Sequence, residues 1–546
     1  MLHLTNDPSA ASALRSQIAK ASILPRIWAH DHTVWKDDPI EIGNRLGWLH
    51  LPETMPKQLA EIDRFASSVR DDRFRHVLLL GMGGSSLAPE TFALTFGAAQ
   101  DHPDLTVLDS THPDAVRAVE RRLDLARTLF IVATKSGTTA ETLSFFRYFH
   151  GQAARACGDD APGDRFVAIT DPGSPLVSLA RRHRFRAIFE NDPNLGGRYA
   201  ALSHFGLVPA ALLGIDVAEL LARSQRTARA CAVAQDPDVN PAARLGTFLG
   251  ASARAGRDKA TFVVSDGIAS FGNWVEQLIA ESTGKEGAGI LPVVDEPIGP
   301  PTAYRDDRLF VHLCADNDAS DDDAVAALGV AGHPVARIDV PDRLEIGGEF
   351  FLWELATAIV GHALRTNPFD QPNVESAKAA TREMVDAYRE TGALPDVPTA
   401  APTPDGVGAF LDRGGPGDYV ALHAYLPPTQ AIADGLRALR AAIRDRLHLA
   451  TTVGFGPRFL HSTGQLHKGD RGNGLFLQLL ADPAGDIPIP DEAGGDTSTL
   501  TFGALLAAQA GGDRRALTDA GRRVLTLRLD RDGTIEQIQH LAGGIS

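Results

Sequence analysis

Short apolar runs that alternate with helical segments are the feature that most restricts how this chain can fold. Five such runs fall between residues 76 and 191, namely HVLLL, LTVLDS, TLFIVAT, DRFVAIT and RAIFEN. Strands that are apolar throughout must be covered on both faces, and helices between them allow parallel pairing in βαβ units. The pattern therefore predicts an α/β chain built on a parallel sheet.

The same pattern restarts twice further along the chain. After a helical stretch from Val217 to about Gly256, the runs KATFVVSD, ILPVV, RLFVHLC and PVARIDV precede two long helices expected at 348–365 and 374–388. A Pro-rich stretch then separates these from DYVALHAYL, GLFLQLL and VLTLRLD, with a further helix expected from Thr429. We therefore predict an N-terminal helical and irregular segment, two doubly wound parallel-sheet domains, a linker and a smaller C-terminal α/β domain. Their expected bounds are 1–70, 71–235, 236–392, 393–408 and 409–546.

Composition argues against several classes of protein. The 546-residue chain carries 53 basic and 69 acidic residues, a net charge of -16, which disfavours nucleic acid or an anionic membrane as its partner. Three Cys occur, far apart and without CxxC spacing, so neither a disulfide framework nor a zinc site is expected. The N-terminus lacks the apolar core of a signal peptide, and no apolar stretch is long enough to span a bilayer. These features favour a cytoplasmic protein.

One acidic stretch, DNDASDDDAVAAL from Asp316, resembles a calcium-binding loop in part. It lacks the Gly and the closing Glu of that loop. An Asp-rich helix start accounts for it, because carboxylates are favourable at a helix N-terminus. We therefore predict no metal site.

Two loops that follow strands have the composition of a phosphate site. GMGGSS, residues 81–86, offers three glycines for close backbone approach and two serines at a helix start. ATKSGTTAET, residues 133–142, places five hydroxyls and one Lys before a helix. Helix capping would use one or two of these hydroxyls, whereas a helix N-terminus rich in hydroxyls solvates a phosphate. GMGGSS matches neither the dinucleotide nor the Walker pattern, so we expect the phosphate of a small metabolite.

Three further segments carry reactive side chains. NDPNLGGRY places Arg198 after two glycines, where a guanidinium could face an oxyanion. WVEQLIAESTGK places Gln277 and Glu281 four residues apart on one face of a helix, and Lys285 follows one turn later. NPFDQPNVESAK carries Gln371 and the Lys seven residues after it. Taken singly, these segments are also typical of a turn arginine, an exposed ion-pair ladder and a capped helix with a solvated Lys.

Taken together and in this order, the motifs resemble those of the phosphoglucose isomerase family. The resemblance covers roughly residues 75–380, and GGRY and the FDQxxVExxK of 369–378 are its most specific parts. It implies two sugar-isomerase (SIS) type domains. It further implies an aldose–ketose isomerase that interconverts glucose 6-phosphate and fructose 6-phosphate through a cis-enediolate, without metal or organic cofactor.

The resemblance also implies a role for each matching residue. Arg198 would face the enediolate, Glu281 would carry the proton between C1 and C2, and Lys378 would lie near the ring oxygen and phosphate. The other matching positions would bind substrate: the sugar by Gly84, Ser85, Gly197, Gln277 and Gln371, and the 6-phosphate by Thr134, Lys135, Ser136, Thr138 and Thr139.

The histidine that opens the sugar ring departs from the usual order of that family. The family carries a Gly-Gln-His segment between its Glu and Lys motifs, and residues 289–345 contain none. The nearest relative is HSTGQLHKG in the C-terminal unit, which resembles the isomerase portion of bacterial transaldolase–isomerase fusions. We expect His467 to open the ring, with His461 as the alternative, and either residue could instead be a structural histidine.

Two other functions remain open at this point. An isomerase of broader specificity, which also accepts mannose 6-phosphate, would show the same motifs. A non-catalytic sugar-phosphate sensor would keep the hydroxyl cluster but would need neither Arg198 nor Glu281. Because the family completes its site across subunits, the resemblance also implies a homodimer.

Overall fold

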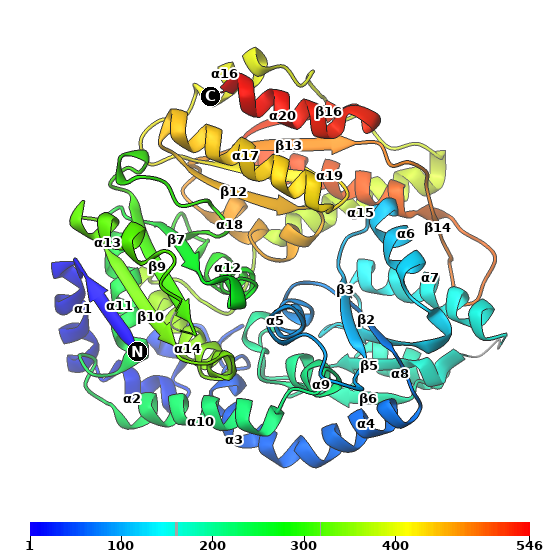
Figure 1. The fold of residues 1–546 in the computed structure, drawn as a ribbon, viewed down its shortest axis with the longest axis horizontal. Coiled ribbons are helices and arrows are strands. Elements are labelled where there is room, and N and C mark those ends of the chain that lie inside the picture. The colour runs from blue at the N-terminus through cyan, green and yellow to red at the C-terminus, as the bar shows by residue number, and fades with distance from the viewer. Residues whose placement is uncertain (159–161, 317, 546) are drawn as a thin grey trace.

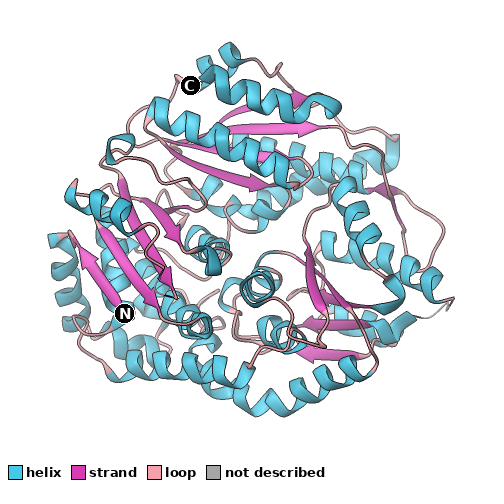
Figure 2. Cartoon of the chain, in the orientation of Figure 1, coloured by secondary structure: helices cyan, strands magenta, loops and turns pink. Residues whose placement is uncertain are grey.

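Three mainly parallel sheets surround a common centre (Figure 1). This computed structural model describes residues 1–158, 162–316 and 318–545, so the acidic stretch that begins at Asp316 is described only in part. The first sheet lies in the blue-to-cyan lobe, the second in the green lobe and the third in the orange-to-red lobe. Helices pack around each sheet (Figure 2), which confirms the α/β class with doubly wound sheets that the alternating pattern predicts.

The first sheet is parallel throughout, with the order β3-β2-β4-β5-β6. Its strands are β2 (His76–Gly81), β3 (Asp104–Leu108), β4 (Thr128–Ala133), β5 (Phe166–Thr170) and β6 (Ala187–Glu190). The helices of this lobe are α5 (Leu87–Phe96), α6 (Pro113–Arg122), α7 (Ala140–Cys157), α8 (Pro175–Arg182) and α9 (His204–Leu212). The strand order reverses between β2 and β4, and such a reversal opens a ligand crevice outside the carboxyl ends of the strands.

The second sheet has the order β1-β10-β9-β7-β8, and its order reverses between β7 and β9. Its strands are β1 (Leu2–Thr5), β7 (Lys259–Val264), β8 (Leu291–Val293), β9 (Arg308–Ala315) and β10 (Val335–Val340). Its helices are α10 (Val217–Val233), α11 (Pro241–Arg254), α12 (Phe271–Thr283), α13 (Asp322–Val330) and α14 (Ile346–Leu364). Helix α12 follows β7, so it leaves the sheet at the reversal.

The N-terminal segment differs in one respect from the helical and irregular structure expected there. It begins with β1, which pairs antiparallel with β10 at the edge of the second sheet, and Leu2 lies opposite Ile338. Four residues are too few for a strand to be recognised from alternation, so only the tertiary structure reveals it. Helices α1 (Ser9–Lys20), α2 (Ile23–Trp28), α3 (Leu51–Thr54) and α4 (Leu59–Asp71) follow. Trp48 of this segment packs against Tyr199, with ring centroids 5.2 Å apart.

The third sheet, β12-β11-β13-β16, is also parallel. Its strands are β11 (Tyr419–Tyr425), β12 (Ala450–Phe455), β13 (Gly474–Ala481) and β16 (Arg523–Leu529), and the short β14 (Pro488–Ile489) and β15 (Leu500–Thr501) pair beside it. Helices α15 (Val374–Thr391) and α16 (Pro404–Leu411) precede it, and α17 (Gln430–Leu447), α18 (Gly464–Gly469), α19 (Phe502–Asp519) and α20 (Thr534–Ile545) belong to it. The expected linker is therefore helical from Pro404, where Thr403 caps the helix and Pro occupies its first turn.

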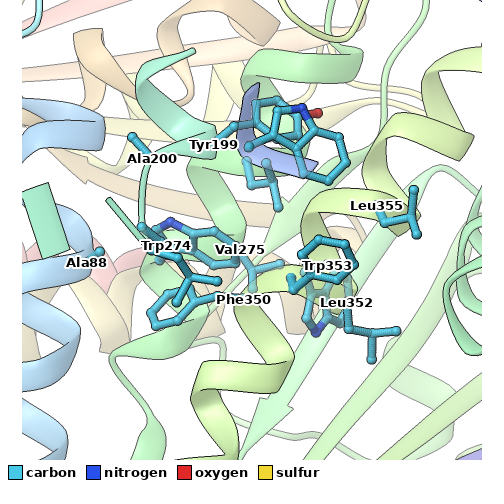
Figure 3. Packing of buried hydrophobic residues seen from close by; sticks show 14 of the residues in the cluster. Ala88, Tyr199, Ala200, Trp274, Val275, Phe350, Leu352, Trp353 and Leu355 are labelled. Atoms are coloured by element: carbon cyan, nitrogen blue, oxygen red, sulfur yellow. The ribbon is translucent and has the colours of Figure 1, made fainter. Parts of the chain in front are cut away.

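One hydrophobic core extends through the first two sheets. It contains Val77 of β2 and Phe262 of β7 together with most of α14. In this core Phe350 of α14 meets Trp274 of α12 edge-on, with ring centroids 4.6 Å apart, as the close view in Figure 3 shows. Phe350 also contacts Phe92 of α5 at 5.4 Å. The two domains therefore share the packing that holds α12 in place.

Among the described residues, no helix combines the length and the apolar character that crossing a membrane requires.

Replacing Phe350 by Ala tests this shared core. The ring is fully buried, and a large-to-small change of this kind costs about 3–5 kcal/mol because part of the cavity remains. We expect the urea midpoint of unfolding, followed by circular dichroism, to fall accordingly. The control Leu94→Ala, at a side chain that is 68% exposed on α5, should change the free energy of unfolding by less than about 0.5 kcal/mol. Equal midpoints for both variants would contradict the shared core.

Candidate active site

The GMGGSS and GGRY loops meet directly in the crevice between β2 and β4. A Cβ placed on Gly84 would lie 2.1 Å from the carbonyl oxygen of Gly197 and 2.8 Å from the amide nitrogen of Arg198. No side chain fits such a gap, so the close contact of the two loops requires a glycine at position 84. Ser85 lies beside this contact and is buried.

The hydroxyls of TKSGTTAET gather at the N-terminus of α7, as the sequence predicts. Thr134 Oγ1 lies 2.7 Å from Thr139 Oγ1, and Ser136 Oγ lies 2.9 Å from Thr138 Oγ1. Lys135 lies in the same loop and donates to Asp171 at 2.5 Å. Free amide groups and hydroxyls at a helix start form an anion site, since both present partial positive charge.

A carboxylate and a guanidinium face each other where the first and second lobes meet. Arg198 Nη1 lies 3.3 Å from Glu281 Oε2, and Gln277 Nε2 donates to the same oxygen at 3.2 Å. Gln277 and Glu281 project from one face of α12, and Glu281 is only 9% exposed. A buried carboxylate with a guanidinium beside it can exchange a proton with a bound ligand while the cation stabilises negative charge.

Arg198 is itself fully engaged by the second half of the chain. Its Nε donates to Ser282 Oγ at 2.8 Å, and its Nη2 donates to the carbonyl oxygens of Pro368 at 2.7 Å and Asp370 at 2.8 Å. Its Nη1 donates to Gln371 Oε1 at 3.0 Å. The structure therefore brings Gln371 into the same cluster as Arg198, Gln277 and Glu281.

Lys285 holds the loop that receives Arg198. Its Nζ donates to the carbonyl oxygens of Asn367 at 2.7 Å and Asp370 at 2.6 Å, and to Asp370 Oδ1 at 2.7 Å. Burial, and after it the positive charge of Arg198, lowers the pKa of Lys285 to about 7. The ammonium is therefore destabilised at this place, and three acceptors compensate for its burial.

His461 is the histidine that lies at this cluster. Its carbonyl oxygen accepts from Gln277 Nε2 at 2.8 Å, and its Nε2 lies 2.9 Å from Glu141 Oε1 in the first turn of α7. The same Glu141 oxygen accepts from Gln509 Nε2 of α19 at 2.7 Å. Burial opposes ionisation of Glu141, but His461 and, more weakly, Lys378 outweigh it and hold the pKa of that carboxyl below its usual value.

His467, the residue expected to open the ring, lies elsewhere. It is 2% exposed, its Nδ1 lies 3.1 Å from His423 Nε2, and its ring contacts Phe476 in the interior of the third lobe. Burial, followed by the neighbouring His423, lowers the pKa of His467 well below its usual value. His467 lies on α18, and its ring packs against His423 and Phe476 rather than against Gln277 and Glu281, so the geometry favours the alternative, His461.

Lys378 occupies the rim of the cluster. Its Nζ donates to Glu375 Oε1 at 2.8 Å, one turn earlier on α15, and its side chain is 47% exposed. Its charge acts on Glu141, which places it on the side of α7.

Two residues of the cluster are absent from the prediction made on sequence. Glu141 lies within the ATKSGTTAET motif, in the first turn of α7. An acidic residue at that position is explained by its favourable interaction with the helix N-terminus, so the sequence offered no reason to assign it to the site. Gln509 carries no local signal, because its partners Thr111 and Glu141 are 398 and 368 residues away. A contact of this range can be found only from the tertiary structure.

Comparison with known proteins agrees with the resemblance of the motifs. The chain matches the family model described as phosphoglucose isomerase over residues 65–290. A probable glucose-6-phosphate isomerase of Haloarcula marismortui is 32% identical over 359 residues, which cover 58% of this chain and 80% of that protein. The glucose-6-phosphate isomerase of Rubrobacter xylanophilus is 29% identical over 410 residues, which cover 66% of this chain and 92% of that protein.

A solved structure shows the same fold. The glucose-6-phosphate isomerase of Chlamydia trachomatis superposes with a TM-score of 0.60 at 17% identity, over 70% of this chain and 86% of that one. This chain belongs to the phosphoglucose isomerase family, and it is an aldose–ketose isomerase.

Replacing Lys285 by Met tests whether this buried ammonium organises the site. Removing one partner from a buried ionic cluster typically costs about 3–5 kcal/mol, and here it frees the loop that holds Arg198 and Gln371. We expect a lower unfolding temperature and at least a roughly tenfold loss of kcat, since misplaced catalytic groups are costly.

Lys36→Met is the matched control for Lys285→Met. Lys36 forms an ion pair with Glu286 at 2.7 Å, with side chains 33% and 55% exposed, and exposed pairs contribute about 0–1 kcal/mol. If Lys285→Met kept full activity while Lys36→Met lost it, the loop would not depend on Lys285.

Proposed function

We propose that this chain interconverts glucose 6-phosphate and fructose 6-phosphate by proton transfer through a cis-enediolate. The observation that carries the proposal is the buried pair of Glu281 and Arg198, whose oxygen and nitrogen lie 3.3 Å apart beside the phosphate-type loop. Glu281 takes the proton from the carbon next to the carbonyl and returns it to the neighbouring carbon. Arg198 stabilises the negative charge that develops on the enediolate oxygens.

The remaining residues of the cluster bind and orient the sugar phosphate. Thr134, Lys135, Ser136, Thr138 and Thr139 receive the 6-phosphate at the start of α7, where amide groups favour a dianion. Gly84 and Ser85 approach the sugar with their backbone, and Gln277 and Gln371 hold its hydroxyls. Lys378, at the rim, adds a positive charge on the side of the phosphate. This chemistry needs no metal and no organic cofactor.

His461 opens the cyclic sugar in this proposal. Ring opening needs one group that exchanges a proton with the ring oxygen or the anomeric hydroxyl, and a histidine does so near neutral pH. Glu141 orients the imidazole through Nε2, with 2.9 Å between the two atoms. His467 lacks access to a ligand, because its ring is enclosed by His423, Phe459 and Phe476.

The alternatives make different demands on this cluster. A sugar-phosphate sensor would need the loop at α7 but would have no use for a buried Glu281 opposite Arg198. An isomerase that also accepts mannose 6-phosphate would use the same catalytic groups, so substrate comparison alone distinguishes it. The scarcity of cysteine supports a cytoplasmic location, and a homodimer remains a prediction from the family.

Replacing Glu281 by Gln tests the proton carrier. The amide keeps the size of the side chain but cannot accept the proton, so the rate of fructose 6-phosphate conversion without added metal should fall by roughly 10²–10⁴-fold or more. Binding of the sugar phosphate, measured by calorimetry, should persist. Glu276→Gln, five residues earlier on α12, is the matched control and should keep its activity. Wild-type protein that binds the sugar phosphate without turning it over would favour the sensor.

Replacing each of the two histidines by Asn tests which one opens the ring. His461→Asn should lower kcat by roughly 10²-fold or more, because the ring loses its acid and base. His467→Asn should lower the unfolding temperature and keep most of kcat, because that ring packs in the third lobe away from the cluster. The measurement is the initial rate together with the unfolding temperature of each variant. The reverse pattern would restore His467 as the ring-opening residue.

A further inference from the structure

The residues from 409 to 545, called the third domain below, reach the catalytic cluster of the same chain at two points. His461 comes from the segment between β12 and α18, and Gln509 comes from α19. Both bind Glu141 of α7, at 2.9 Å and 2.7 Å. We propose that the third domain completes the catalytic site of its own chain, so that His461 acts with the Glu281 of the same chain and not with that of a second copy. The inference rests on the proposed function, which assigns ring opening to His461.

Gln509 is the positioning residue of this arrangement. Its side-chain oxygen accepts from Thr111 Oγ1 at 2.8 Å, and its amide donates to Glu141 at 2.7 Å, so it bridges the loop after β3 and the start of α7. The side chain is 3% exposed. A buried amide that satisfies two partners fixes both of them, because either one would otherwise be left without a hydrogen bond. Glu141 is thereby held in place to receive His461.

Apolar packing joins the third domain to the first sheet. Phe502 at the start of α19 stacks on Phe145 of α7, with ring centroids 5.6 Å apart and planes 16° apart. Ile487, Ile489 and Leu505 of the third domain lie in the same buried cluster as Leu80 of β2. An interface of buried aromatic and aliphatic side chains holds two bodies together permanently, unlike the polar contacts of domains that move apart.

A second apolar contact joins the third domain to the second sheet. Leu466 of α18 and Phe476 of β13 share a buried cluster with Ala280 of α12. A Cβ on Gly284, at the end of α12, would lie 2.3 Å from the Cα of Leu466. The third domain therefore packs against the helix that carries Gln277 and Glu281.

Charged side chains also join the third domain to the first lobe. Arg458, three residues before His461, pairs with Glu90 of α5 and lies 3.1 Å from Asp109 after β3. Arg117 of α6 donates to the carbonyl oxygens of Gly485 at 2.9 Å and Asp486 at 2.7 Å. These partners all lie on the first lobe and the third domain, so the contact continues outward from the cluster to the surface.

The segment of the chain that connects the second and third domains also lies at this contact. The loop that Lys285 and Arg198 hold leads directly into α15, and α15 packs along α19 of the third domain. Asn373, just before α15, accepts from Gln465 Nε2 of α18 at 2.7 Å and donates its own backbone N–H to Gln465 Oε1 at 2.9 Å. The chain thus passes from the catalytic cluster to the third domain without leaving the contact between them.

Chemical cross-linking tests the inference without relying on activity. Arg117 and Gly485 are replaced by Cys in a Cys157→Ser background, because Cys157 is partly exposed and Cys231 and Cys314 are buried. The three atoms nearest to a Cβ at position 485 all belong to the Arg117 side chain, the nearest being 3.2 Å away, so both changes fit the structure. The diluted protein is treated with a short bismaleimide and its products are separated by denaturing gel and weighed by intact mass.

The inference predicts a single chain that carries one linker joining positions 117 and 485, with only the buried thiols of Cys231 and Cys314 left free. Covalent dimers as the main product of the double variant would overturn it, because they would show that the third domain docks on another copy. The two single-Cys variants are the controls, since neither can form the bridge within one chain. An altered role of His461 would not change these products, so failure of the inference is separate from failure of the proposed function.

Mixed oligomers provide the second measurement. Glu281→Gln and His461→Asn chains are co-expressed with different affinity tags, and protein that carries both tags is isolated. If the site were shared between copies, one of the two sites of a mixed dimer would be intact, and about half of the wild-type activity would return. A site completed within each chain leaves the mixed species as inactive as its parents. Absence of any mixed species, with wild type running as a monomer, also supports the inference.

Discussion

The buried guanidinium of Arg198 is the interaction on which the rest of the site depends. It comes from the first lobe, and its partners Ser282, Pro368, Asp370, Gln371 and Glu281 all come from the second half of the chain. A charge with 2% exposure persists only where hydrogen bonds replace its water. Arg198, which we propose to stabilise an anionic ligand, therefore requires the two lobes to meet in one geometry. Lys285 supports the same geometry, because it donates hydrogen bonds to the loop whose carbonyl oxygens accept from Arg198.

The topology of the two sheets brings these groups to one place. The strand order reverses between β2 and β4 in the first sheet and between β7 and β9 in the second, and each reversal opens a crevice at the carboxyl ends. The loops at the first crevice supply backbone and hydroxyl groups, and α12 at the second supplies Gln277 and Glu281. Shared packing around Phe350 and Trp274 fixes the relative position of the two crevices. The phosphate recognition and the proton transfer that we propose thus come from different lobes.

The third domain adds what the first two lobes lack. Within the cluster described here, the first two lobes contribute carboxylates, amides, hydroxyls and cations, and His461 of the third domain contributes the imidazole. Glu141 connects the two parts, because its carboxylate stands at the phosphate-type loop and binds both His461 and Gln509. In the proposed function, the histidine absent from the usual place in the family's motif order is therefore supplied from a later part of the chain.

The sequence by itself determined the features that depend on neighbouring residues. Apolar runs indicated the main strands of all three sheets, although β1 and β12 were missed. The spacing of Gln277 and Glu281 placed them on one helical face, and the hydroxyls of TKSGTTAET were expected together because they lie within nine residues at a helix start. Such features follow from local backbone geometry, which a short stretch encodes.

Only the tertiary structure decided which groups meet across long separations. His461 and His467 lie six residues apart in one motif, yet one faces Gln277 and the other is enclosed beside His423. Glu141 gains its partners 320 and 368 residues away, and Lys285 proves to be a buried anchor rather than an exposed member of an ion-pair ladder. The physical reason is that these roles depend on which lobes pack together. That packing is driven by the burial of apolar surface from distant parts of the chain, which no short stretch of sequence encodes.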